Sequence, residues 1–377
     1  MLSFDRLGNR RYLLPVLAVI VFGCVFSLVV APMLRATPRD VPIAVASLDT
    51  GATTPAGDLN LGATLVGQLT AAAAAAGDAA PIAWTQLDSE AAVDAALDDN
   101  EYYGAVVIPA DFSQAQAAAQ AGTGEAPAVR VIINQGKNPM LAATMQQAIA
   151  AVFTQAGVKT TVELVHAAAI GGGPTAALMG SQMLIMPLVM MTMGGTLLLF
   201  LTLRPPKTAT RSEKLKAYGR QVAYAAVLSL VVACAAVLTV TWIGGLSLPF
   251  GTLTLFLWLG CFAIMALFLG TLSLAVPLGA LVIVLVFAGG MSSAMLAREM
   301  LPQFWQGWIY PWAPQHYLAL GDSQIIYMGS GAWTDGSLPL LITALVGLVV
   351  LLLAALVPAR PPRPAGTAAA AEAPAAA

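Results

Sequence analysis

Long uncharged apolar runs alternate with short polar segments along most of this 377-residue chain. Most runs have about the 20 residues that a helix needs to cross the hydrocarbon core of a bilayer, and the run from Thr252 to Leu296 is roughly twice as long, so it must fold back on itself. The pattern therefore predicts an α-helical membrane protein with six transmembrane helices. Their expected spans are residues 12–34, 181–203, 221–243, 253–275, 277–296 and 337–357.

Residues 35–174 break this pattern, because short β-rich runs there alternate with Ala-rich segments. Such alternation predicts an α/β domain with a parallel or mixed sheet, inserted between the first two transmembrane helices. The expected strands are residues 41–48, 81–87, 104–109 and 128–134, and the expected helices are residues 59–76, 89–98 and 111–121. Ser89 and Asp111 stand at expected helix N-caps.

A longer helix is expected after Asn138, where apolar residues recur at helical spacing. Gly157 interrupts it, and the helical pattern resumes through Val162 and Val165. Residues 171–174, GGGP, then form the expected hinge between the domain and the membrane.

Basic residues concentrate in residues 204–220, between two predicted transmembrane helices, where Glu213 is the only acid. They are Arg204, Lys207, Arg211, Lys214, Lys216 and Arg220, six of the 17 Lys and Arg residues. Short loops rich in Lys and Arg stay on the cytoplasmic side of a membrane. The segment is either a plain orientation signal or, in addition, a docking surface for a cytoplasmic partner.

The side of every other segment follows from this loop by alternation. Residues 1–11 and the Ala/Pro-rich, disordered tail 358–377 are expected in the cytoplasm, and residues 35–174 on the outer side. The outer segment carries five basic and thirteen acidic residues, whereas the cytoplasmic segments together carry eleven basic and three acidic residues. This asymmetry agrees with the orientation.

Seven Trp and Tyr residues gather in residues 297–336, between the fifth and sixth predicted helices. They are Trp305, Trp308, Tyr310, Trp312, Tyr317, Tyr327 and Trp333. Such aromatic residues favour the membrane–water interface. Because Pro and Gly interrupt the segment, we expect an outer re-entrant or interfacial helical segment rather than a span.

The amino-acid composition, and the absence of certain motifs from the sequence, restrict the functional classes to which this protein can belong. Hydrophobic residues make up 58% of the chain and charged residues 10%, which is typical of an integral membrane protein in contact with lipid. The predicted spans contain no Asp, Glu, Lys, Arg or His, which argues against a proton- or ion-coupled transporter. The chain has no G-x-x-x-x-G-K-[ST] phosphate-binding loop, so ATP would have to bind a partner subunit. We expect no metal, no cofactor in this chain, no enzyme activity and no nucleic-acid partner.

The arrangement resembles the permease subunits of type-2 ABC exporters, in which a first helix, a large outer domain and five further helices follow one another. The resemblance implies a cytoplasmic ATP-binding subunit that contacts residues 204–220, and a homodimer or heterodimer of permeases. It also implies that residues 297–336 form the outer re-entrant element.

Three strings resemble the YhgE/Pip family, the phage infection protein-like membrane proteins: VPIAVASLDTGA (41–52), YYGAVVIPADFS (102–113) and VIINQGKNPM (131–140). The resemblance marks as candidate site residues Asp49, Gly51, Tyr102, Tyr103, Gly104, Asn134, Gly136, Asn138 and Pro139. Several of these residues also suit tight turns after strands, so turn formation is the alternative to a ligand site.

We therefore expect an ABC-type exporter permease in the bacterial plasma membrane, with both termini in the cytoplasm, that moves a hydrophobic or amphipathic cargo. The alternative is a cell-surface receptor or secretion-machinery scaffold, phage-infection-protein-like, without transport activity. A neighbouring ATPase gene would favour transport.

Overall fold

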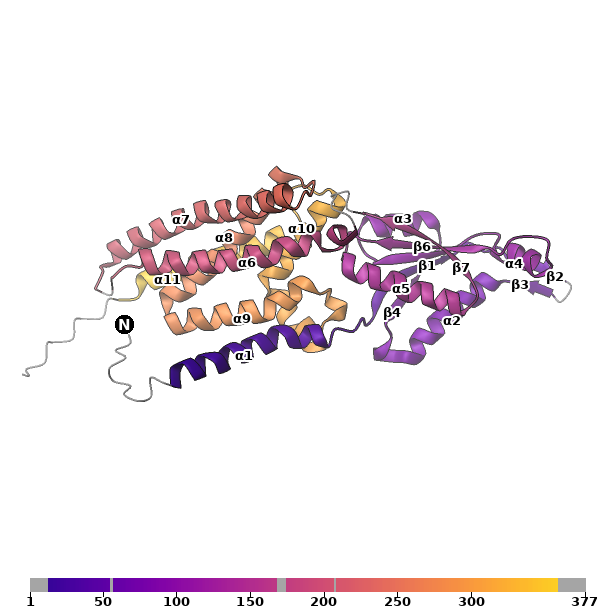
Figure 1. Ribbon diagram of the computed structural model, residues 1–377, viewed down its shortest axis with the longest axis horizontal. Helices are drawn as coiled ribbons and strands as arrows, with labels where there is room; N and C mark the ends of the chain where they lie inside the picture. The colour runs from indigo at the N-terminus through magenta and orange to yellow at the C-terminus, as the bar shows by residue number, and fades with distance from the viewer. Residues whose placement is uncertain (1–12, 55–56, 168–173, 207, 359–377) are drawn as a thin grey trace, which may run out of the picture.

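The computed structural model describes residues 13–54, 57–167, 174–206 and 208–358. Four expected features fall outside these residues: the N-terminal segment 1–11, Lys207, the glycines of the 171–173 hinge and the tail from residue 359. Figure 1 shows an elongated molecule with a helical bundle at one end and a sheet flanked by helices at the other.

The larger sheet has the strand order β4-β1-β5-β6-β7. Its strands are β1 (Val41–Ser47), β4 (Ile82–Gln86), β5 (Gly104–Ile108), β6 (Ala128–Asn134) and β7 (Lys159–Val165). β1 pairs in parallel with β4 and β5, β6 runs antiparallel to β5, and β7 runs parallel to β6. The sheet is therefore mixed. A small hairpin of β2 (Ala52–Thr54) and β3 (Gly57–Leu59) lies at the end farthest from the bundle (Figure 1).

β7 corrects the sequence prediction, which continued a helix through Val162 and Val165. Helix α5 (Pro139–Gln155) ends just before Gly157, whose φ of 69° is incompatible with a continuing right-handed helix. The following segment has the sequence KTTVELV, whose β-branched residues favour a strand. β6 offers the edge on which this strand pairs.

The two faces of the sheet pack against different helices because successive residues of a strand point to opposite faces. Ile43 belongs to the core that includes side chains of α2 (Leu61–Ala76) and α5. Ala44 belongs to the core on the other face, with side chains of α3 (Glu90–Asp98). The sheet therefore has a hydrophobic core on each face.

Both expected N-cap positions are confirmed, but only one of the two side chains makes a capping hydrogen bond. The Ser89 hydroxyl accepts a hydrogen bond from the backbone N–H of Ala92 at the start of α3, as predicted. Asp111 is the N-cap residue of α4 (Phe112–Gln120), as predicted, but its side chain makes no capping hydrogen bond. The distant Asp49 carboxylate takes this role, because it accepts the backbone N–H of Ser113 at 3.1 Å.

Five helices in the described part of the chain are long and apolar enough to cross a membrane, so the chain is a membrane protein. They are α6 (Pro174–Leu203), α7 (Arg211–Leu238, continued to Ile243), α8 (Phe250–Leu274), α9 (Val276–Met295) and α11 (Ser337–Leu356). α1 (Leu13–Leu34) lies alongside α9 (Figure 1). The apolar part of α1 that is described, Gly23–Leu34, is shorter than a span, so a sixth crossing stays a prediction.

α8 is the central helix, packed against α6, α7, α9, α10 and α11. Gly270 of α8 lies against the backbone of Gly347 in α11, and a Cβ added at either position would overlap the other helix. Small residues at such a crossing let two membrane helices approach closely. The chain then reverses at Ala275, which is extended, and α9 begins at once with Pro277 in its first turn.

α10 (Pro314–Met328) lies in the segment that the sequence placed at the outer interface. Its 15 residues rise only about 22 Å, short of the roughly 30 Å hydrocarbon core. α10 nevertheless packs against α6, α8, α9 and α11. Of the two expected forms, these contacts favour a re-entrant helix over one lying flat at the interface.

Candidate functional site

The basic segment lies at the end of the bundle farthest from the sheet (Figure 1). α6 ends at Leu203 and α7 begins at Arg211, so half of the segment is a loop and half is the start of a helix. Thr210 and Glu213 form a reciprocal capping box that fixes where α7 begins. The sequence therefore presents several of its cations on a rigid helix rather than on a loop.

The described basic residues divide by their contacts. Arg211, Lys216 and Arg220 have exposed side chains along the first turns of α7, and we call these three the basic surface. Lys214 is half-buried and donates from Nζ to the carbonyl oxygen of Val357 at 2.7 Å, which ties α7 to the end of α11. The Arg204 guanidinium lies 6.0 Å from the centre of the Phe200 ring. Three of the described cations are therefore exposed on α7, whereas Lys214 and Arg204 contact other groups of the chain.

At the opposite end, Asp49 joins three segments. Its carboxylate accepts the backbone N–H groups of Gly51 at 3.1 Å, of Gly62 at 2.9 Å and of Ser113 at 3.1 Å, and it also accepts the Ser113 hydroxyl. Gly62 and Ser113 belong to the first turns of α2 and α4, where N–H groups have no helical partner. Open α/β sheets bind ligands beyond the carboxyl ends of their strands, and an anionic ligand there accepts the free N–H groups of helix N-termini. In this protein the carboxylate of Asp49 accepts those N–H groups itself.

The hydrogen bonds also determine the pKa of Asp49. Burial alone would raise this pKa, but the hydrogen bonds from the Ser113 hydroxyl and from the three amides outweigh burial and lower it. The carboxylate is therefore the form that the fold stabilises.

Asn134 is the second centre of the YhgE/Pip-like strings. Its buried side-chain amide donates to the carbonyl oxygen of Tyr102 at 3.1 Å, and its oxygen accepts the backbone N–H of Gly136 at 2.9 Å. Gly104 lies so close to the Ile132 carbonyl that a Cβ there would overlap it. These contacts favour turn formation and strand packing over a ligand site for this group of residues.

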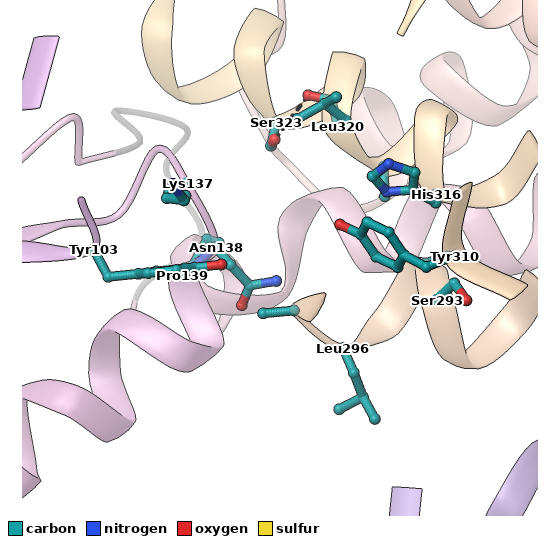
Figure 2. A pocket seen from close by; sticks show the side chains of 13 residues that line it. Tyr103, Lys137, Asn138, Pro139, Ser293, Leu296, Tyr310, His316, Leu320 and Ser323 are labelled. Carbon is teal, nitrogen blue, oxygen red and sulfur yellow. Dashed lines mark hydrogen bonds between the residues drawn. The ribbon is translucent and has the colours of Figure 1, made fainter. Parts of the chain in front are cut away.

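Tyr103, Asn138 and Pro139 instead reach the boundary between the sheet region and the bundle. They and Lys137 line one side of a cavity of about 50 Å³ (Figure 2). The other side comes from the end of α9 and from the segment that follows it. Its residues are Ser293, Ala294, Leu296, Ala297, Tyr310, His316, Ala319, Leu320 and Ser323. A volume of this size holds water or one small polar group.

Hydrogen bonds connect the two sides beside this cavity, and we call this group the joint. The Tyr103 hydroxyl donates to the Glu299 carboxylate at 2.8 Å, and the Arg39 N–H donates to the Glu299 carbonyl at 3.0 Å. The Lys137 ammonium lies 5.1 Å from the centre of the Tyr103 ring and donates to the Glu101 carbonyl at 2.6 Å. Burial raises the pKa of the Tyr103 hydroxyl, as does the neighbouring Glu299 carboxylate, and burial lowers the pKa of Lys137.

His316 packs inside the joint between two tyrosines. Its ring centre lies 3.7 Å from that of Tyr310 and 4.5 Å from that of Tyr317. Burial, assisted by the charge of Arg298, lowers the pKa of His316 to about 4. The imidazole is therefore neutral at physiological pH, and Figure 2 shows it facing the cavity with Tyr310.

Sequence analysis missed Glu299 and Asp322, and the reason is the same for both. Each is an isolated acid in residues 297–336, which the sequence placed outside the six spans. Asp322 is completely buried on α10. A usable signal was present, since an isolated acid in a segment rich in apolar and aromatic residues is costly unless it has a role.

Comparison with known families settles the class of the protein. The profile of the ABC-2 family transporter proteins matches residues 12–203, from α1 through the sheet to the end of α6. The chain belongs to the ABC-2 transporter family. The match covers 192 of the 377 residues. Neither a curated protein nor a solved structure matches the chain.

Membership of the ABC-2 family gives the chain a general role. ABC-2 proteins are the membrane-embedded transport components of ABC systems, and they normally work with a cytoplasmic subunit that binds ATP. The apolar helices agree with the multi-pass membrane protein that this family predicts.

Proposed function

We propose that this chain is the permease subunit of an ABC-type exporter in the bacterial plasma membrane. A separate ATPase docks on the basic surface in the cytoplasm, and the sheet region faces the outside. The observation that supports this most is the position of the basic surface and the sheet at opposite ends of the bundle in an ABC-2 protein (Figure 1). Under this proposal α1 is the sixth span, both termini are cytoplasmic, and the permease works as a homodimer or heterodimer.

The contacts of α7 supply a route for force. Closure of the ATPase would push on the first turns of α7, which packs against the central helix α8. Lys214 links the same turns to Val357 at the end of α11, so α7 and α11 would move together. At the other end, the joint passes this movement to the sheet through Glu299 and Tyr103. Rigid-body tilting of packed helices is a common way to switch access.

The cargo that suits this bundle is hydrophobic or amphipathic. The sequences of α6, α8, α9 and α11 contain no Asp, Glu, Lys, Arg or His, so they offer no hydrated path for a strongly polar solute. Exporters of this kind move lipids, lipophilic compounds or polymers outward.

Charge reversal at the basic surface tests the proposal. The variant Arg211→Glu, Lys216→Glu, Arg220→Glu should weaken binding to the co-purified ATPase by about 100-fold, because like charges across an interface cost several kcal/mol. ATP-driven export of a fluorescent lipid analogue should be lost with it. Lys214 is left unchanged because it bonds within the chain.

A matched pair of single variants separates docking from general charge effects. Lys216→Glu should reduce ATPase binding, whereas Lys159→Glu, an exposed reversal on β7, should leave it unchanged. Correct insertion of each variant is checked by labelling from both sides. Full export by the correctly inserted triple variant would contradict the proposal.

The second candidate, a YhgE/Pip-like receptor or scaffold, makes the opposite prediction. It places the activity in the sheet region, whose exposed residues would bind a protein, and it needs no ATPase. Unchanged cellular function after charge reversal, together with loss of function after substitution of exposed sheet residues, would favour that alternative.

A further inference from the structure

Asp322 is a buried acidic residue whose carboxyl group makes no hydrogen bond that would stabilise the described part of the fold. Its side chain is completely buried on α10, and neither carboxyl oxygen has a hydrogen-bond partner among the residues that the structure describes. Asp49, the other buried acid discussed above, has four donors. Burying a carboxyl group without such partners costs free energy. Asp322 therefore lowers stability where an apolar residue would raise it.

The helices packed against α10 offer Asp322 no positive charge, and beyond them Lys137 of the sheet region lines the same cavity as Ser323, the next residue along α10. α10 packs against α6, α8, α9 and α11, and the sequences of all four helices lack Lys, Arg, His, Asp and Glu. The one other titratable side chain of α10 besides Tyr317 and Tyr327 is His316, which lines the joint cavity and is neutral. Arg298, the nearest cation in the preceding segment, is exposed.

The residues one turn away from Asp322 along α10 are apolar, whereas the adjacent Ser323 and the Thr334 hydroxyl beside Gly321 are polar. Leu318 and Ile325, one turn away on either side, are buried in the bundle core. Gly321 packs against the ring of Phe256 on α8, and Leu318 packs against Gly260 of the same helix. A group that satisfied the carboxylate here would have to bring both a positive charge and an apolar surface.

We propose that Asp322 recognises the cargo, and that the cargo is a lipophilic cation such as an alkylammonium or arylphosphonium compound. This inference rests on the proposed exporter function, because it specifies the substrate class of the same permease. The apolar body of the cation packs between α8 and α10, and its charge pairs with the carboxylate. In the closed bundle the carboxyl group keeps its proton, which passes to water when the cation binds.

α10 is built to admit such a group by moving as a unit. It does not cross the bilayer, it is preceded by a helical turn at Trp305–Ile309, and it ends at Gly329 in the left-handed conformation. Its close contacts with α8 are made at glycines. A shift of this short helix relative to α8 would expose Asp322 between them.

The test uses two ions of nearly equal size and opposite charge, tetraphenylphosphonium and tetraphenylborate. The purified full-length chain in lipid nanodiscs should bind tetraphenylphosphonium saturably and tetraphenylborate only as strongly as the lipid does. Binding of the cation should strengthen between pH 6 and pH 8, because a proton competes for the carboxylate. Asp322→Asn should weaken it at least about 30-fold, the loss expected when one partner of a buried charge pair is removed.

Thermal stability distinguishes recognition from a structural role. Asp322→Leu should raise Tm while abolishing cation binding, because it replaces a buried carboxyl group that has no partner with an apolar side chain. Asp322→Asn should abolish cation binding without a gain in Tm, because its amide is left without partners as well. Asp335→Asn, at an exposed acid hydrogen-bonded to Gln324, should retain cation binding. Cation binding by Asp322→Asn at the wild-type level would overturn the inference. So would a fall in Tm in Asp322→Leu.

The exporter proposal and this inference fail separately. The triple charge reversal at the basic surface should block ATP-driven export and leave tetraphenylphosphonium binding intact. If the wild-type protein exports a neutral lipid analogue but does not bind the cation, the cargo class is wrong and the exporter function stands.

Discussion

Substitution of Asp49 by Ala should loosen the sheet region locally rather than unfold the bundle. The Asp49 carboxylate accepts two buried N–H groups, those of Gly62 and Ser113, at 2.9 and 3.1 Å. Each buried amide left without an acceptor costs about 1–3 kcal/mol. Loss of a negative charge at the starts of α2 and α4 adds roughly 0.3–1 kcal/mol for each helix. The expected cost is therefore about 4 kcal/mol.

Hydrogen exchange of the full chain measures this cost at the affected helices. A loss of about 4 kcal/mol should speed exchange of the amides in α2 and α4 roughly 10³-fold when opening and reclosing are fast relative to the intrinsic exchange, since 1.4 kcal/mol is tenfold. The amides of α8 should be unchanged, because α8 lies in the bundle. Asp58→Ala, an exposed acid on β3, is the matched control and should shift exchange by less than about 0.5 kcal/mol.

Acid should reproduce the effect in the wild-type protein. The pKa of Asp49 is lower in the folded chain than its ordinary value of 3.8, so its stabilisation is complete above that value and is lost as pH falls through the folded pKa. The exchange of α2 and α4 should therefore lose its protection at strongly acidic pH in the wild type and show no such step in Asp49→Ala. Less than tenfold faster exchange in Asp49→Ala at neutral pH would refute this explanation.

Three further predictions concern the joint and the bundle. Tyr103→Phe and Glu299→Gln should each destabilise the joint, with a coupling of about 1.5–3 kcal/mol in a double-mutant cycle of thermal unfolding; additive effects would contradict their hydrogen bond. Gly270→Ala should cost about 1–3 kcal/mol and Gly194→Ala, which has open space around it, should be neutral or stabilising in the same assay. Because burial lowers the pKa of His316 to about 4, protonation is disfavoured in the fold, and stability should fall from about pH 6.5 toward pH 4; His316→Gln should flatten this dependence of Tm on pH.

The sequence predicted correctly those strands and helix caps that are determined by residues close together in the chain. The β-rich run of β1 and the Ser89 cap are local patterns, and both are present. β7 was predicted as a helix because its pairing with β6 depends on an edge that is absent from its own sequence. Asp111 is the N-cap residue of α4, as predicted, but the carboxylate that accepts the Ser113 N–H belongs to Asp49, 62 positions earlier in the chain, which no local pattern reveals.

The candidate site residues also fall into two groups, those that a local sequence pattern reveals and those that only the fold brings together. A cluster of cations such as Arg211, Lys216 and Arg220 is visible in the sequence because the residues are adjacent, and the structure adds only that Lys214 is engaged by Val357. The joint brings together residues 196 positions apart, Tyr103 and Glu299, which no local pattern connects. Asp322 was missed because its burial depends on how α10 packs, not on its neighbours in sequence.

The central claim is that the sheet region and the basic surface lie on opposite sides of the membrane. Single cysteines at exposed positions test it most directly, at Gln114 on α4 and at Ser212 on α7, in a chain whose three native cysteines, Cys24, Cys234 and Cys261, are replaced. In intact cells a membrane-impermeant maleimide should label position 114 and should label position 212 only after permeabilisation. Labelling of position 212 in intact cells, or protection of position 114, would contradict the account.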